Sequence, residues 1–142
     1  MKLVAFVGLH DAGKTTLVEK VARLLKERGY RVCYLKHDPK GHGVTDREGS
    51  DTWRVKPFCR KAGLLSPSLF TLWELEPPPL KELIRRYFND CDVLLLEGFK
   101  SVGWLPKVVV GELKVENAVL KVGKDAEPED IIKLIEELEE VL

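Results

Sequence analysis

Apolar residues along the chain follow two alternating patterns: short continuous runs, and segments in which they recur every three or four positions. The runs predict strands at residues 3–7, 32–35, 92–98, 107–110 and 118–122. The helical spacing predicts a helix that ends near Gly29, a second that opens after Pro77-Pro78-Pro79, and a third from about Pro128. Strands that alternate with helices in this way are typical of an α/β protein with a mostly parallel central sheet and helices on both faces.

The pattern is less regular between the second strand and the three prolines. Residues 37–49 are polar and glycine-rich and predict a mobile loop, and a helix over part of residues 50–61 is interrupted or restarted at Pro57. Residues 64–66 and 69–75 predict two strands that meet at a Pro-Ser turn. These strands form either a hairpin that contributes to a subunit interface or part of the core sheet. No second domain is apparent, so we expect residues 1–142 to form one domain.

The first predicted strand leads directly into a complete P-loop, Gly8-Leu9-His10-Asp11-Ala12-Gly13-Lys14-Thr15-Thr16. Backbone N–H groups of such a loop surround phosphates, and the helix that follows adds the positive end of its dipole. We therefore expect the three-layer fold of P-loop NTPases. Lys14 is predicted to bridge the β- and γ-phosphates as a catalytic residue, and Thr15 to bind Mg²⁺. The predicted nucleotide-binding residues of this loop are Gly8, Asp11, Ala12, Gly13, Lys14, Thr15 and Thr16.

A second candidate for chemistry, Glu97, lies at the carboxyl end of the apolar run 92–98. Ligands of open α/β sheets bind at that end of the strands. A carboxylate there holds Mg²⁺ through water or orients an attacking water, and phosphoryl chemistry needs both roles. Glu97 is therefore predicted to be catalytic and a metal ligand.

The polar segment 36–54 leaves the carboxyl end of the second strand, so we expect it to lie beside the phosphates. It carries three acids that could approach Mg²⁺ and three bases that could approach anions, namely Asp38, Asp46 and Asp51, and Lys36, Arg47 and Arg54. The sequence does not decide which of these side chains face the site. From this segment we take Asp38 as a candidate metal ligand, and as candidate nucleotide-binding residues Lys36, His37, Asp51 and Arg54.

Charge and cysteine content exclude several classes of function. The chain has 23 Lys and Arg against 23 Asp and Glu, so it lacks the positive charge that polynucleotide binding uses. Its three cysteines, Cys33, Cys59 and Cys91, are far apart and form no C-x-x-C, so neither a zinc knuckle nor a disulfide framework is predicted, and a reducing cytoplasm fits best. No segment resembles a signal peptide or a membrane span, so no membrane partner is expected.

Several motifs together resemble the MobB family of molybdopterin-guanine dinucleotide biosynthesis adapter proteins. They are the P-loop, Lys36-His37-Asp38, Gly41-His42-Gly43, Asp46, Gly49-Ser50-Asp51, Arg54, Leu96-Glu97-Gly98-Phe99-Lys100 and Leu105-Pro106-Lys107. The resemblance covers about residues 1–110, and Pro57 departs from it because it lies where the family usually has a helix. It implies a GTP-binding protein of the SIMIBI type, usually a homodimer, that assists the guanylyltransferase joining GMP to molybdopterin.

We therefore expect a cytoplasmic, Mg²⁺-dependent GTP-binding protein with slow GTP hydrolysis, whose partners are that guanylyltransferase, molybdopterin and a second copy of the chain. One alternative is a small-molecule kinase, although no basic lid segment is apparent. The other is a metal-delivery GTPase, although the chain lacks clustered Cys or His and an Asn-Lys-x-Asp motif.

No motif of the sequence identifies the base, so guanine is implied by the resemblance alone. The candidate for base recognition is Asp125, in the loop after the last predicted strand. Its carboxylate could accept two hydrogen bonds from guanine, which adenine does not offer as a pair. Capping of the helix from Pro128 is the alternative role of Asp125.

Overall fold

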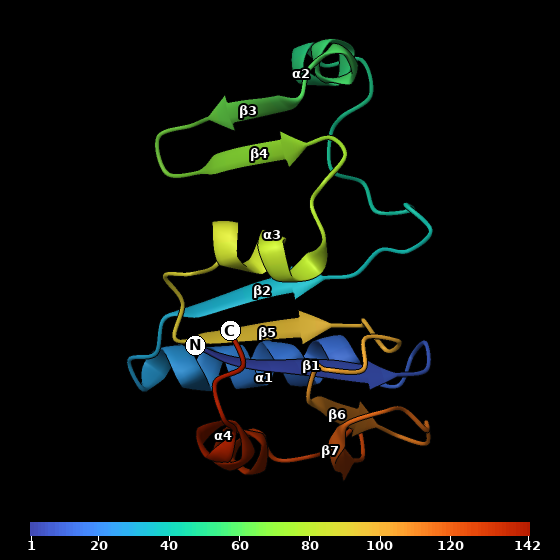
Figure 1. The fold of residues 1–142 in the computed structure, drawn as a ribbon, viewed down its shortest axis with the longest axis vertical. Helices are drawn as coiled ribbons and strands as arrows, with labels where there is room; N and C mark the ends of the chain where they lie inside the picture. Colours follow the sequence, from blue (N-terminus) through green and yellow to red (C-terminus); the bar gives the residue numbers. More distant parts are fainter.

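The computed structural model describes residues 1–142 and is built around a five-stranded sheet with strand order β2-β5-β1-β6-β7 (Figure 1). All neighbouring strands in it are parallel. The strands are β1 (Lys2–Gly8), β2 (Val32–Lys36), β5 (Val93–Glu97), β6 (Lys107–Val110) and β7 (Ala118–Val122). The predicted strands and their parallel arrangement are confirmed.

Helices cover both faces of this sheet, as predicted. On one face, α1 (Lys14–Glu27) and α4 (Pro128–Glu137) pack against β1 residues Val4 and Phe6. On the other face, α3 (Leu80–Tyr87) packs against Leu3 and Ala5. Successive β1 residues alternate between two apolar layers and are almost fully inaccessible, as expected of a central parallel strand. No helix combines the length and the apolar character needed to cross a membrane.

The irregular middle of the chain forms a separate unit. It consists of α2 (Asp51–Val55), a short 3-10 turn (Lys56–Phe58), and the antiparallel strands β3 (Lys61–Leu65) and β4 (Phe70–Glu74). Pro57 lies in the 3-10 turn, so the predicted interruption of the helix is confirmed. Figure 1 shows α3 between this hairpin and the central sheet. A hairpin is therefore correct, and the alternative of two core-sheet strands is wrong.

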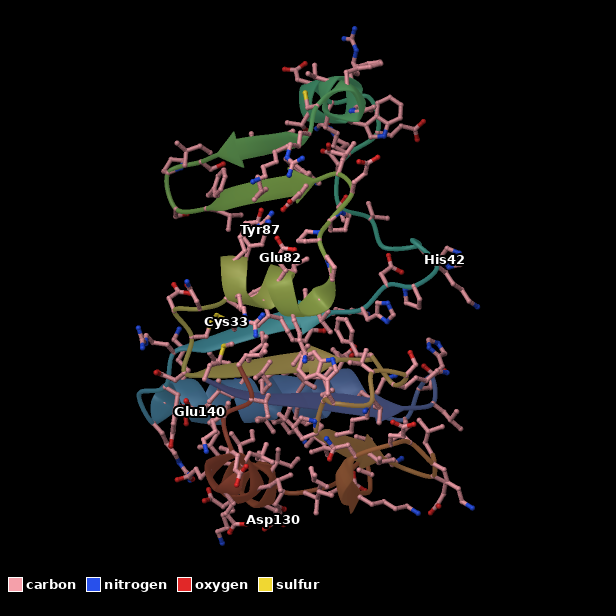
Figure 2. The ribbon with its side chains drawn as sticks, viewed as in Figure 1. Cys33, His42, Glu82, Tyr87, Asp130 and Glu140 are labelled. Carbon is pink, nitrogen blue, oxygen red and sulfur yellow. A yellow bond between two sulfur atoms is a disulfide. The ribbon has the colours of Figure 1, made fainter.

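The hairpin rests on α3 through one acidic side chain. Glu74 accepts hydrogen bonds from Arg86, at 2.9 Å, and from the hydroxyl of Tyr87. Figure 2 shows Tyr87 on the side of α3 that faces the hairpin. The hydrogen bond from Tyr87 keeps the pKa of Glu74 below its usual range, and the positive charges of Lys61 and Arg86 act in the same direction. The contact fixes one end of the hairpin, while several of its apolar side chains remain exposed to solvent.

Two of the three cysteines form a disulfide, so the prediction of none was wrong, and the cysteine content no longer supports a reducing compartment. Cys33 lies in β2 and Cys91 just before β5, and their Cα atoms are 6.0 Å apart. Their separation of 58 residues carries no local signal, but β2 and β5 are neighbours in the sheet. Figure 2 shows Cys33 on β2 at the edge of the sheet. The bridge ties this edge strand to the connection between α3 and β5, and Cys59 stays free.

Lys107, the last residue of the Leu105-Pro106-Lys107 motif, has a role that only the structure reveals. It is fully buried, and its ammonium donates to the carbonyl oxygens of Val102, Leu105 and Glu116 at 2.6, 3.1 and 2.9 Å. Burial lowers its pKa from the ordinary lysine value. The side chain thereby joins the loop before β6 to the loop after it, so Lys107 has a structural role.

Candidate nucleotide-binding site

The carboxyl ends of three strands meet at one edge of the sheet. In the register of the sheet, Glu97 at the end of β5 pairs with Phe6 of β1 on one side and with Lys36 of β2 on the other. The P-loop follows β1 at this same edge and leads into α1. Glu97, Lys36 and the P-loop are therefore brought together by the parallel pairing, as the strand positions predicted.

A hollow of about 360 Å³ lies at this edge. Its lining contains eight of the predicted site residues, namely Asp11, Ala12, Gly13, Lys14, Thr15, Thr16, Lys36 and Glu97. His10 also lines the hollow.

The backbone of the P-loop requires its two glycines for different reasons. A Cβ on Gly8 would lie 2.6 Å from the carbonyl oxygen of Val110, so β6 leaves room only for glycine. Gly13 has φ 89°, a left-handed conformation, and is the N-cap of α1. No side chain caps this helix, and no acidic residue stands in its first turn. The first N–H groups of α1 are thus free to bind an anion.

The hollow brings lysine ammonium groups close to hydroxyl and carboxylate oxygens of the kind that bind Mg²⁺. Lys14 donates from its ammonium to the carbonyl oxygen of Gly8 at 2.9 Å. The Thr15 hydroxyl lies 3.1 Å from each carboxylate oxygen of Glu97, and the Lys36 ammonium lies 3.8 Å from Glu97 Oε2. The Glu97 side chain is only 4% exposed. Hydroxyl and carboxylate oxygens are the ligands that Mg²⁺ prefers, so Thr15 and Glu97 fit this ion.

Tyr34 is a site neighbour that the sequence analysis missed. It precedes Lys36 by two positions on β2 and therefore shares its side of the sheet. Burial raises the pKa of Tyr34 to about 12, and the nearby charge of Glu97 acts in the same direction. The phenol is therefore protonated at neutral pH and available as a donor to Glu97. The two-residue spacing from Lys36 was the signal that could have identified it.

His37 and Asp38 do not line the hollow. The N–H of His37 donates to the carbonyl oxygen of Glu97 at 3.0 Å, and its ring stacks on Phe99 with centroids 4.6 Å apart. Asp38 accepts from the N–H groups of Gly43, at 2.7 Å, and His42, at 3.1 Å. These bonds, the Gly43 bond first, keep the pKa of Asp38 below its usual range. Asp38 therefore orders its own loop in this structure, in which Figure 2 shows His42 at the outer end.

Asp51 and Arg54 belong to α2, which Figure 1 places beyond the hairpin and away from the P-loop. The chain does not bring them to its own hollow. Asp46 lies near α2 as well, where it is 2.8 Å from the ammonium of Lys56 and also accepts from the Thr52 hydroxyl. Asp46 thus anchors the start of α2.

Asp125 does not line the hollow. Its neighbour Lys124 approaches the P-loop so closely that a Cβ added to Gly13 would be 3.1 Å from the Lys124 Cβ. The N-cap residue of α4 is Glu127, and no side chain caps that helix. Asp125 therefore does not cap α4, which was its alternative role in the sequence analysis. Its carboxylate is exposed and free.

Comparison with known families agrees with this geometry. The family described as "Molybdopterin guanine dinucleotide synthesis protein B", MobB, matches residues 3–137. The chain belongs to the MobB family. The resemblance inferred from the motifs is thereby confirmed, and it extends through β7 and α4, beyond the part that the motifs covered. Neither the kinase nor the metal-delivery alternative is favoured.

Individual members of the MobB family are similar to the chain over about three quarters of its length. A probable molybdopterin-guanine dinucleotide biosynthesis adapter protein of Bacillus subtilis is 36% identical over 118 residues, 76% of this chain and 64% of that protein. The adapter protein of Haemophilus influenzae is 31% identical over 112 residues, 76% of this chain and 62% of that protein. The chain thus spans less than two thirds of these curated relatives.

A solved MobB structure supports the fold. The structure of Bacillus subtilis MobB superposes with a TM-score of 0.73 and 22% identity, covering 99% of this chain and 100% of that one. At this level of identity the likeness shows the architecture alone.

Proposed function

We propose that the chain binds GTP together with Mg²⁺ in the P-loop hollow and acts as an adapter in molybdopterin-guanine dinucleotide biosynthesis. The observation that carries this proposal is the meeting of Lys14, the uncapped start of α1 and the Thr15–Glu97 pair in one hollow. The N-terminus of α1 can bind phosphate, and the oxygens of Thr15 and Glu97 beside it can bind Mg²⁺. This combination suits a nucleoside polyphosphate. Membership of the MobB family supports the pathway.

Each residue of the hollow has a distinct part in this proposal. Thr15 and Glu97 would hold Mg²⁺, which supplies charge neutralisation at the phosphates. Lys14 would leave the Gly8 carbonyl and neutralise the β- and γ-phosphates. Glu97 would orient the attacking water, and Tyr34 would keep the Glu97 carboxylate in place by a hydrogen bond.

Replacing Glu97 by glutamine is expected to leave GTP binding in place, because the amide oxygen can still bind Mg²⁺. It is expected to slow hydrolysis by about a hundredfold or more, because the amide cannot accept the proton of the water. Basal turnover of the unmodified protein is itself expected to be slow, since no glutamine or arginine lines the hollow. Phosphate release under single-turnover conditions measures both rates. Glu112→Gln, an exposed change elsewhere, is the control. Equal turnover of Glu97→Gln and the unmodified chain would remove Glu97 from the mechanism.

For the base, we propose that Asp125 accepts hydrogen bonds from guanine. Asp125→Ala is then expected to bring the affinities for GTP and ATP within about twofold of each other, since the guanine-specific bonds are lost. Competition titrations with a fluorescent nucleotide measure this ratio, with Glu139→Ala, at the far end of the chain, as a control. Retention of the full GTP preference in Asp125→Ala would contradict the assignment.

The adapter role implies contact with the guanylyltransferase and with molybdopterin, in the cytoplasm where GTP is available. The direct test is the yield of molybdopterin-guanine dinucleotide when the purified guanylyltransferase is supplied with this chain and with its Lys14→Ala variant. A higher yield with the unmodified chain alone supports the role. No effect of either protein contradicts it.

We further propose that the hairpin contributes to a homodimer. Four apolar residues in the hairpin or just before it are strongly exposed in the single chain: Phe58 (89%), Leu65 (82%), Leu69 (65%) and Phe70 (60%). Apolar surface of this kind is typical of an interface. Light scattering that gives the mass of two chains supports the proposal, and the mass of one chain at micromolar concentration contradicts it.

A further inference from the structure

Of the two lysines that line the hollow, Lys36 is the one to which the proposed function assigns no role. Its side chain is 63% exposed, and its ammonium approaches the nearly buried Glu97 carboxylate to 3.8 Å. The hydroxyl of Thr15, which is neutral, is the side-chain hydrogen-bond donor to this carboxylate. The Lys36 ammonium is the only positive charge within 4.0 Å of it.

We propose that Lys36 lets the site distinguish a nucleoside triphosphate from a diphosphate. This inference rests on the proposed function of the hollow as a nucleotide site. Lys36 pairs with Glu97 while no metal is bound, and its ammonium moves to the terminal phosphate when Glu97 binds Mg²⁺.

Electrostatics require this movement. A carboxylate that holds a divalent cation no longer attracts an ammonium at the same distance, because the two cations repel each other. The side chain of Lys36 is long and exposed, so it can move without disturbing the core. Its backbone stays in place, because the next residue, His37, is bonded to the Glu97 carbonyl and stacked on Phe99.

No other cation that lines the hollow is placed to do this. Lys14 is committed to the bridge between the β- and γ-phosphates. Arg47 and Arg54 do not line the hollow, so the chain offers neither of them to its own nucleotide. The imidazole of His10 lines it, but it is exposed and lies 3.4 Å from Asp11.

A diphosphate lacks the group that receives the displaced ammonium. Lys36 then either remains on Glu97, where it opposes metal binding, or leaves it without a new partner. Both outcomes weaken the complex, so the ratio of triphosphate to diphosphate affinity depends on Lys36.

The test compares the affinities of a non-hydrolysable GTP analogue and of GDP by calorimetry in excess Mg²⁺. Lys36→Gln is expected to lower the ratio of the two affinities by about tenfold to a hundredfold, the range for a charged hydrogen bond. Lys36→Arg should preserve most of the ratio because it keeps the charge. Lys40→Gln, which removes an exposed charge from the adjoining loop, is the matched control and should leave the ratio unchanged.

A second measurement needs no nucleotide. Lys36→Gln is expected to bind Mn²⁺ several-fold more tightly than the unmodified chain, by electron paramagnetic resonance, because no ammonium competes for Glu97. A merely structural role of Lys36 would not produce this change.

The outcomes separate this inference from the proposed function. An unchanged affinity ratio in a folded Lys36→Gln protein overturns the role of Lys36 while the nucleotide site stands. If the unmodified chain binds neither nucleotide, the proposed function fails. In that case an unchanged Mn²⁺ affinity also overturns the competition between Lys36 and the metal.

Discussion

Replacing Lys14 by alanine is expected to weaken GTP binding by about a thousandfold and to leave the fold intact. The ammonium of Lys14 donates only to the Gly8 carbonyl, so its removal costs the fold about 1 kcal/mol. In the complex the same ammonium would meet the charge of two phosphate groups, which backbone amides alone would otherwise neutralise. Loss of a buried charged partner costs roughly 2–5 kcal/mol, or about thirty- to several-thousandfold in affinity.

Fluorescent GTP titrations in Mg²⁺ measure the affinity of this variant, and far-ultraviolet circular dichroism checks that it is folded. The matched control is Lys20→Ala, which removes an exposed lysine from α1 outside the hollow. The control is expected to bind GTP as the unmodified chain does. Near-normal affinity in a folded Lys14→Ala protein would show that the phosphates are not held by this loop.

Removal of the Cys33–Cys91 disulfide is expected to lower the free energy of unfolding by about 4 kcal/mol. In the chain-entropy account, a bridge between residues 58 positions apart restricts the unfolded chain by about this amount. Cys33→Ser and chemical reduction of the unmodified protein should therefore shift the denaturation midpoint in the same direction.

Guanidinium denaturation with and without a reductant measures this effect. Cys59→Ser, which removes the free cysteine, is expected to leave the oxidised protein unchanged. The disulfide would be refuted by three titratable thiols in the unfolded, non-reduced protein, together with a midpoint that does not respond to reductant.

The sequence predicted the centre of the fold and site well because the signals there are local. A strand that runs into a P-loop defines the hollow, and an apolar strand ending in Glu97 places a carboxylate at the same edge. Lys36 followed from the same rule, since parallel strands deliver their carboxyl ends together.

The remaining features depend on contacts between distant residues. Asp38 is held by its own loop, and Asp51 and Arg54 are carried away on α2, because the hairpin unit leaves the central sheet after β2. The charges of these three residues gave no indication that the chain leaves the central sheet after β2. The pairing of Cys33 with Cys91 likewise follows from the adjacency of β2 and β5, which only the strand order reveals.

The hairpin could be predicted from the sequence only in part. Alternating apolar residues and a Pro-Ser turn predicted two strands, and both formed within a few residues of the expected positions. Whether they joined the core depended on α3, which lies between the hairpin and the sheet. The same alternation fits a buried strand and an exposed hairpin, so pattern alone left both open.

Nucleotide binding in the P-loop hollow is the central claim, and calorimetric titration of the purified chain with a non-hydrolysable GTP analogue tests it most directly. The titration is run with Mg²⁺, with a chelator in its place, and with the corresponding ATP analogue. We expect one saturable site per chain that binds the GTP analogue more tightly than the ATP analogue and weakens when Mg²⁺ is removed. The absence of saturable binding of either analogue in the presence of Mg²⁺ would contradict the account.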